Sequence, residues 1–127
     1  MHILLIDDKK SILDVVTPLL IQAGHTVETA SNGLDAFEKA QKTPFDLYII
    51  DHLMPVMNGL QLSKNLLNNP FTANTPAIFM TTQNLAEVTA LTRSLSFQAI
   101  ITKPIDESSL LNAVNQNNQQ NSTRYSL

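Results

Sequence analysis

The sequence contains no cysteine and no tryptophan, and it has few glycines and few charges. Its 127 residues include three glycines, 8 basic and 11 acidic side chains. Because cysteine is missing, the chain can form no disulfide, no thiol nucleophile and no thiolate zinc site. The formal charge of −3 disfavours direct binding to nucleic acid or to an anionic membrane, since a negative protein field repels both.

Long apolar stretches are missing as well. No uninterrupted apolar run exceeds five residues. Such runs are too short to span a membrane or to serve as the apolar region of a signal peptide. Much of the polar surface comes from amides, because Asn and Gln number 20 against 19 charged residues. The length fits one domain with a single core, and we therefore expect a small cytoplasmic domain.

Short apolar runs alternate with longer amphipathic segments along the chain. Runs of consecutive apolar residues suit strands that are covered on both faces, as in a parallel sheet, and they occupy 3–6, 47–50, 77–80 and 99–101. An alternating, β-branched segment at 26–30 predicts a more exposed edge strand. The order of strands and helices predicts a doubly wound α/β domain with right-handed crossovers.

Helical spacing and capping residues predict the helices between these strands. The expected ranges are 11–23, 31 or 32 to 42, 58–67, 84–95 and 106 to about 114. Pro18 should bend the first helix, because it removes the hydrogen bond to the Asp14 carbonyl. An amide-rich segment follows the last helix, so we expect a domain over residues 1–118 and a disordered polar tail or linker over 119–127.

Polar residues follow the apolar runs at the points where the strands should end. Asp7 and Asp8 follow the first run, Asp51 another, and Thr81 and Lys103 the last two. The carboxyl ends of parallel strands lie at one edge of a sheet, where ligands of open α/β folds bind. Three close carboxylates repel one another unless a cation intervenes. An all-oxygen site of this kind suits Mg²⁺ with a phosphate oxygen.

Together these groups describe a site for phosphoryl transfer. Lys103 adds a point charge for the same anion, and Thr81 offers a hydroxyl donor. Asp51 needs no general base, because a carboxylate is ionised at pH 7, and it can attack phosphorus directly. The local charge of three Asp and one Lys is about −2, which makes the metal the first partner and phosphate the second.

The same residues carry a family resemblance. The stretch 51–59 reads D-x-x-M-P-x-x-x-G, and it stands between Asp7-Asp8 on one side and Thr81 and Lys103-Pro104 on the other. These blocks, in this order, resemble the receiver domain of response regulators in two-component phosphorelay systems, in particular the single-domain chemotaxis type. The resemblance covers about residues 1–118.

The resemblance implies a flavodoxin-like five-stranded parallel sheet of order 2-1-3-4-5 with five helices. It also implies that Asp51 accepts a phosphoryl group from a sensor histidine kinase or a histidine phosphotransfer protein. Mg²⁺ would be held by Asp8, Asp51 and the backbone carbonyl of Leu53, with Asp7 acting largely through water.

By the same resemblance, Lys103 would pair with the phosphoryl group and the Lys103–Pro104 peptide bond would be cis. Thr81 would turn towards the phosphoryl oxygen and change a surface that an output protein or an appended domain reads. The chain would therefore be a signalling switch that catalyses only its own phosphorylation and dephosphorylation, not a metabolic enzyme.

Four positions depart from the family pattern. Ile100 stands where many receivers have a switching Tyr or Phe, and an aliphatic side chain cannot make that movement of a ring. Thr82 replaces a smaller residue and narrows access to the site. Leu53 and Gln83 occupy positions that tune self-hydrolysis in the family. Because Leu53 cannot orient an attacking water, we predict a phosphoryl group that lives much longer than seconds.

Other readings of these residues are more ordinary. An isolated pair of acids often caps a helix, and His52 should be a surface residue because its side chain points away from that of Asp51. Two alternative functions follow: an interaction module that acts without phosphorylation, and a Mg²⁺-dependent phosphatase with an Asp nucleophile. The phosphatase is disfavoured because it needs an acid–base carboxylate where the chain has Leu53. The interaction module is disfavoured because all five site residues, Asp7, Asp8, Asp51, Thr81 and Lys103, are present.

Overall fold

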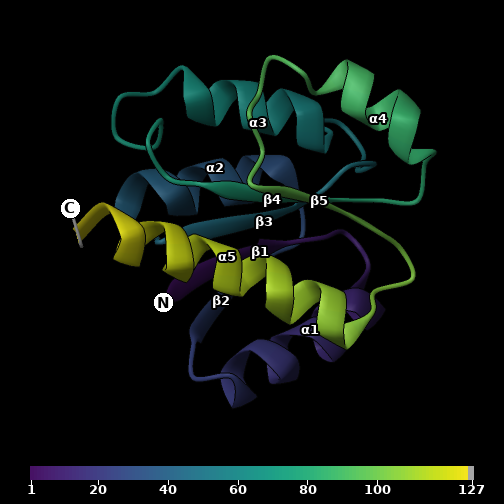
Figure 1. The fold of residues 1–127 in the computed structure, drawn as a ribbon. Coiled ribbons are helices and arrows are strands. Elements are labelled where there is room, and N and C mark those ends of the chain that lie inside the picture. The colour runs from purple at the N-terminus through teal and green to yellow at the C-terminus, as the bar shows by residue number, and fades with distance from the viewer. Residues whose placement is uncertain (126–127) are drawn as a thin grey trace.

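The computed structural model describes the backbone of residues 1–125 and the side chains of residues 1–116. Strands and helices alternate strictly (Figure 1). The strands are β1 (His2–Ile6), β2 (Thr26–Ala30), β3 (Leu47–Asp51), β4 (Ala77–Thr81) and β5 (Ala99–Thr102). The helices are α1 (Lys10–Gln22), α2 (Gly33–Lys42), α3 (Gly59–Leu67), α4 (Leu85–Leu91) and α5 (Glu107–Tyr125).

The five strands form one parallel sheet in the order β2-β1-β3-β4-β5. This confirms the predicted flavodoxin-like order and places β2 at an edge, as its alternating sequence indicated. The central strand β3 is buried along its whole length. Its register pairs Ile50 with Ile6 of β1 and with Phe79 of β4, so the ends of β1, β3 and β4 lie together at the carboxyl edge.

The two faces of the sheet carry separate cores, because successive strand residues point to opposite sides. Leu4, Ile50 and Phe79 pack against α2, α3 and α4. Ile3, Leu5 and Ile49 pack against α1 and α5. Figure 1 shows this three-layer arrangement, with α2, α3 and α4 above the sheet and α1 and α5 below it. The layers hold the carboxyl edge in place from both sides.

Short polar side chains begin four of the helices, as the sequence predicts. The side chains of Asn32, Asn58 and Asn84 each accept a hydrogen bond from the backbone amide three residues later. Asp106 does the same for Ser109. At α3 the Gln61 side chain also accepts from the Asn58 amide, which completes a capping box. This cap anchors the segment that links β3 to α3.

Two helix ends differ from the predictions. The helix expected to reach residue 95 ends at Leu91, where the chain passes into a tighter turn: the Leu95 amide donates to the Thr92 carbonyl, and Ser96 adopts a left-handed φ of 52°. Helix α5 continues to Tyr125, well past the predicted end near residue 114, while the polar tail or linker over residues 119–127 stays a prediction. Adding residues to an existing helix avoids the cost of nucleation. Residues 126–127 lie outside the described residues, and the domain boundary at 118 stays a prediction.

The Pro18 residue lies inside α1 without ending it. No helix in the described part of the chain combines the length and the apolar character that a membrane span requires.

Candidate functional site

Three elements of the fold bring charged groups together at the carboxyl edge of the sheet. Asp7 and Asp8 follow β1, Asp51 ends β3, and Lys103 follows β5. The Lys103 ammonium donates to Asp7 Oδ2 at 2.7 Å and to Asp51 Oδ1 at 2.9 Å. The predicted convergence of these four residues is therefore present, and Asp7, Asp51 and Lys103 are almost fully buried.

Within this cluster the two buried carboxylates differ in how well they are satisfied. Asp7 accepts from the Lys9 amide through one oxygen and from Lys103 through the other. Asp51 bonds Lys103 through Oδ1, while its Oδ2 is buried and has no hydrogen-bond partner within the described residues. Such an atom normally costs stability. Asp51 is therefore the acid with an oxygen available for a further ligand.

The electrostatics of the cluster are set by burial. Burial raises the pKa of Asp51 to about 6, Asp7 adds to the rise by repulsion, and Lys103 opposes it. For Lys103, burial lowers the pKa, but hydrogen bonds and charge attraction from Asp7 and Asp51 outweigh it and leave the pKa raised. Lys103 is thus a cation at neutral pH, and Asp51 is mostly a carboxylate, as the sequence predicts.

The three acids fit a divalent cation. Each of Asp7, Asp8 and Asp51 offers a carboxylate oxygen, and these oxygens lie within 4.8 Å of one another. Asp8 is exposed while the other two are buried, so the group opens to solvent on one side. A set of oxygen donors that opens to water suits Mg²⁺, which keeps several of its waters. The unpartnered Asp51 Oδ2 supports the same fit.

The segment after β3 is tied closely to Asp51. The Gly59 amide donates to the His52 carbonyl at 2.7 Å, and a Cβ atom at Gly59 would overlap the Asp51 carbonyl oxygen. This close approach explains why the motif ends on glycine. Leu53, whose side chain is exposed, lies in this segment. Its predicted role as a ligand through its backbone carbonyl stays a prediction.

The Thr81 hydroxyl is not among the groups gathered around Asp51. Within the described residues it is bonded to His52 Nδ1, at 2.8 Å, and to the backbone amide of Gln83, at 3.0 Å. The Thr81 carbonyl accepts from the Lys103 amide at 2.8 Å, so the backbone of Thr81 positions the lysine. The side chain itself faces the other side of the sheet.

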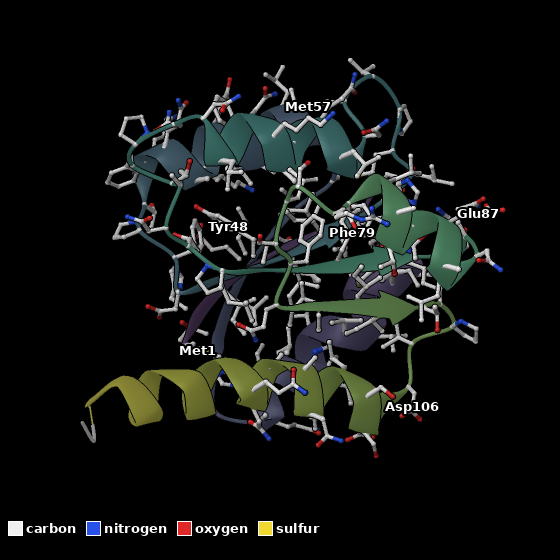
Figure 2. All side chains as sticks on the ribbon, turned by 45° about the horizontal axis from the view of Figure 1, so that its top comes forward. Met1, Tyr48, Met57, Phe79, Glu87 and Asp106 are labelled. Atoms are coloured by element: carbon white, nitrogen blue, oxygen red, sulfur yellow. The ribbon has the colours of Figure 1, made fainter. Side chains whose placement is uncertain are left out.

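His52 corrects one prediction. We expected a surface residue, but its exposed fraction is 6% and its ring contacts Phe79 at a centroid distance of 5.0 Å. The side chain does alternate away from that of Asp51. That direction leads under α3 and α4, where Figure 2 shows Phe79, and not to solvent. Burial lowers the pKa of His52. Only the three-layer packing could have revealed this.

The other departures from the pattern occupy defined places. Ile100 is half-buried on β5, where it pairs with Phe79 and packs against the core. Thr82 is exposed, and its hydroxyl accepts from the Gln83 side chain. The Lys103–Pro104 peptide bond is cis, as the resemblance implied.

Comparison with known proteins bears directly on this site. Residues 3–115 match the family model of the response regulator receiver domain. The chain belongs to the response regulator receiver family. As a receiver domain of the CheY-like type it is a component of two-component signalling, and receivers are typically signalling domains, not metabolic enzymes.

Individual relatives of this receiver domain cover nearly all of it. The protein PilH of Pseudomonas aeruginosa is 31% identical over 90% of this chain and 94% of its own length. The chemotaxis response regulator CheY4 of Vibrio cholerae is 33% identical, with a TM-score of 0.85 over 91% of this chain and 97% of that one. The autoinducer sensor kinase/phosphatase CqsS of Vibrio cholerae is 32% identical over 89% of this chain, which spans 17% of CqsS. The same domain therefore occurs in proteins of very different length.

Proposed function

We propose that this receiver domain takes a phosphoryl group onto Asp51, with Mg²⁺, and thereby changes its binding to a partner protein. The donor is a phosphohistidine of a sensor histidine kinase or of a histidine phosphotransfer protein. In this step a P–O bond forms to the Asp51 carboxylate as the N–P bond of the donor breaks, and its electron pair leaves with the imidazole. Direct contact with nucleic acid or a membrane is not part of the proposal.

One observation carries the proposal. Asp51 is a buried carboxylate with one oxygen bonded to Lys103 and one oxygen without a partner. A protein that needed Asp51 only for its structure would satisfy both oxygens. An unpartnered oxygen next to an ammonium and two further carboxylates suits an acid that binds a cation and an incoming phosphoryl group.

Each neighbouring residue has a proposed part. Asp8, Asp51 and the Leu53 carbonyl would hold Mg²⁺, with Asp7 acting through water. When bound, the metal supplies positive charge that offsets the charge on the phosphoryl oxygens. The Lys103 ammonium, which now bridges two acids, would pair with one of those oxygens.

Thr81 completes the proposed set. Its hydroxyl would turn to a phosphoryl oxygen and so change the surface that an output protein or appended domain reads. Among the relatives, CheY4 is a chemotaxis response regulator and CqsS is a sensor kinase/phosphatase, which supports a kinase as the donor. The cytoplasmic location predicted from the sequence stays a prediction.

The test is phosphorylation by a small donor. Wild type and Asp51→Asn are incubated with acetyl phosphate and Mg²⁺, and intact mass is measured. We expect one phosphate adduct on wild type and none on Asp51→Asn. Asp14→Asn, which alters an exposed acid on α1, is the matched control and should be labelled like wild type.

Two outcomes would contradict the proposal. No adduct on wild type under any condition would leave an interaction module that works without phosphorylation, and turnover of phosphate esters would favour a phosphatase. The decay of the adduct tests the prediction from Leu53, because half-lives of seconds would contradict a long-lived phosphoryl group.

A further inference from the structure

The His52 ring is held on the face of the sheet opposite Asp51. Its Nδ1 lies 2.8 Å from Thr81 Oγ1, its ring contacts Phe79, and its backbone amide donates to the Met80 carbonyl at 2.8 Å. Thr81 is fully buried and His52 nearly so. The hydrogen bond between them is therefore shielded from water, and hydrogen bonds of the sheet hold the backbone of both residues in place.

The Thr81 hydroxyl is already engaged by two groups on this face of the sheet. A hydroxyl has one proton to donate and two lone pairs. The Gln83 amide donates to one lone pair. A second hydrogen bond joins the hydroxyl to His52 Nδ1, in which either Thr81 donates its proton or its other lone pair accepts from the ring. In both cases the hydroxyl is oriented towards His52 and not towards the acidic cluster.

We propose that His52 is a positioning residue that holds the Thr81 hydroxyl in its resting orientation, so that this hydrogen bond must break before Thr81 can bind a phosphoryl oxygen. The inference rests on the proposed function, which assigns that second partner to Thr81. Breaking a buried hydrogen bond opposes the change, and leaving the imidazole without a partner opposes it further. His52 therefore lowers the affinity of the site for a phosphoryl group.

The surroundings of His52 give the hydrogen bond a route to the rest of the fold. Phe79, which the ring contacts, stacks on Phe97 at a centroid distance of 4.6 Å, between α4 and β5. Ile100 of β5 lies beside Phe79 of β4 in the sheet, and it has no ring of its own. A change at Thr81 would thus reach first the ring of His52, directly after β3, and then Phe79.

The experiment measures affinity for fluoroberyllate, a phosphoryl mimic that is not transferred, by titration calorimetry in the presence of Mg²⁺. His52→Phe keeps a ring against Phe79 and removes the hydrogen bond, so it should bind about fivefold more tightly than wild type. His52→Asn places an amide where Nδ1 stands and should stay within about twofold of wild type.

A Thr81→Val background separates this role from a merely structural one. Without the hydroxyl there is nothing for His52 to hold, so His52→Phe should no longer change the affinity. In the metal-free protein, the ¹⁵N chemical shift of His52 Nδ1 should move on Thr81→Val, which tests the resting hydrogen bond directly. Urea denaturation of each variant confirms that it is folded.

The outcomes distinguish this inference from the proposed function. If wild type binds fluoroberyllate and His52→Phe matches it, or if the gain persists with Thr81→Val, the positioning role is overturned. If wild type binds none, the proposed function fails and the inference fails with it. A fivefold gain that requires Thr81 and is absent in His52→Asn supports the inference.

Discussion

The two edges of the sheet treat their polar side chains in opposite ways. At the amino edge the backbone amide of His2 donates to Asp46, and its ring nitrogens bond Thr26 and Glu28 at 2.8 and 3.1 Å. The same ring stacks on Phe45. At the carboxyl edge, the buried acids Asp7 and Asp51 share one buried ammonium, the third acid Asp8 lies close by, and Asp51 keeps an unpartnered oxygen.

This difference separates residues that serve the fold from residues that are kept for a ligand. A satisfied polar network stabilises the strands that it joins. An unsatisfied carboxylate costs stability until a cation or a phosphoryl group arrives. Substitutions at the two edges should therefore differ in size, in sign and in their dependence on pH.

The largest effect should come from Gly59→Ala, which would force the backbone apart next to Asp51 at the carboxyl edge. A methyl group there would overlap the Asp51 carbonyl, and a clash with backbone cannot relax cheaply. We expect a loss of about 3 kcal/mol in the free energy of unfolding, measured by urea denaturation. Gly24→Ala is the control, because Gly24 has open space around it and a φ of 96°; it should cost only about 1 kcal/mol. Equal losses in the two variants would contradict this reading.

The next effect should come from Lys103→Met, which removes the ammonium from the acids. At pH 8 the variant leaves buried carboxylates uncompensated, and we expect a loss of about 2 kcal/mol. At pH 5 Asp51 is protonated, because its pKa is already about 6 with the lysine present, so the loss should shrink. The free energy of unfolding at both pH values is the measurement. Lys39→Met, which removes a half-exposed ion pair with Asp35, should show little pH dependence.

A change of opposite sign should follow from Asp51→Asn. The folded pKa of Asp51 lies above its ordinary value of 3.8, so its favourable contribution is complete below pH 3.8 and is lost as pH rises through about 6. The variant should then be more stable than wild type by about 1 kcal/mol at pH 8, with the gain vanishing near pH 4. Mg²⁺ should raise the unfolding midpoint of wild type but hardly that of the variant.

The matched substitution at the amino edge is Asp46→Asn, where the acid already accepts from the His2 amide. It should destabilise, not stabilise, by about 0.5 kcal/mol in the same urea measurement at pH 8. If Asp46→Asn and Asp51→Asn changed stability in the same direction, the contrast between the two edges would be wrong.

The smallest effect should come from Glu28→Gln. Its ion pair with His2 is partly exposed, with Glu28 at 44%, and such pairs contribute little. We expect a change within about 0.5 kcal/mol at pH 7 by urea denaturation. A loss above about 1 kcal/mol would show that the amino edge depends on this pair more than its exposure indicates.

Most of the fold could be predicted because its signals are local. Apolar runs identified the strands, and Asn32, Asn58, Asn84 and Asp106 each marked a helix start that the structure confirms. The predicted end of α4 was wrong because the chain leaves the helix after Leu91 through a tight turn closed by the Leu95 amide on the Thr92 carbonyl, and because Ser96 takes a left-handed φ. Neither leaves a periodic signal.

The site residues likewise divide into those whose placement could be predicted from the sequence and those whose contacts could not. Asp7, Asp8, Asp51 and Lys103 could be placed together because strand ends in a parallel sheet share an edge. The backbone of Thr81 lies at this edge, as the rule predicts, and bonds the Lys103 amide, but the Thr81 hydroxyl is bonded to His52. The rule predicts where a residue lies along the sheet, but it does not tell which of its atoms meets which neighbour.

By itself the sequence determined the α/β alternation, the strand ends that meet at the carboxyl edge and the acids that stand there. These follow from the periodicity of apolar residues and from the chemistry of the side chains. Only the tertiary structure decided that Asp51 keeps an unpartnered oxygen and that His52, the next residue, is buried against Thr81 and Phe79. Successive residues of a strand point to opposite faces, and whether such a face is solvent or core depends on which helices are packed over it.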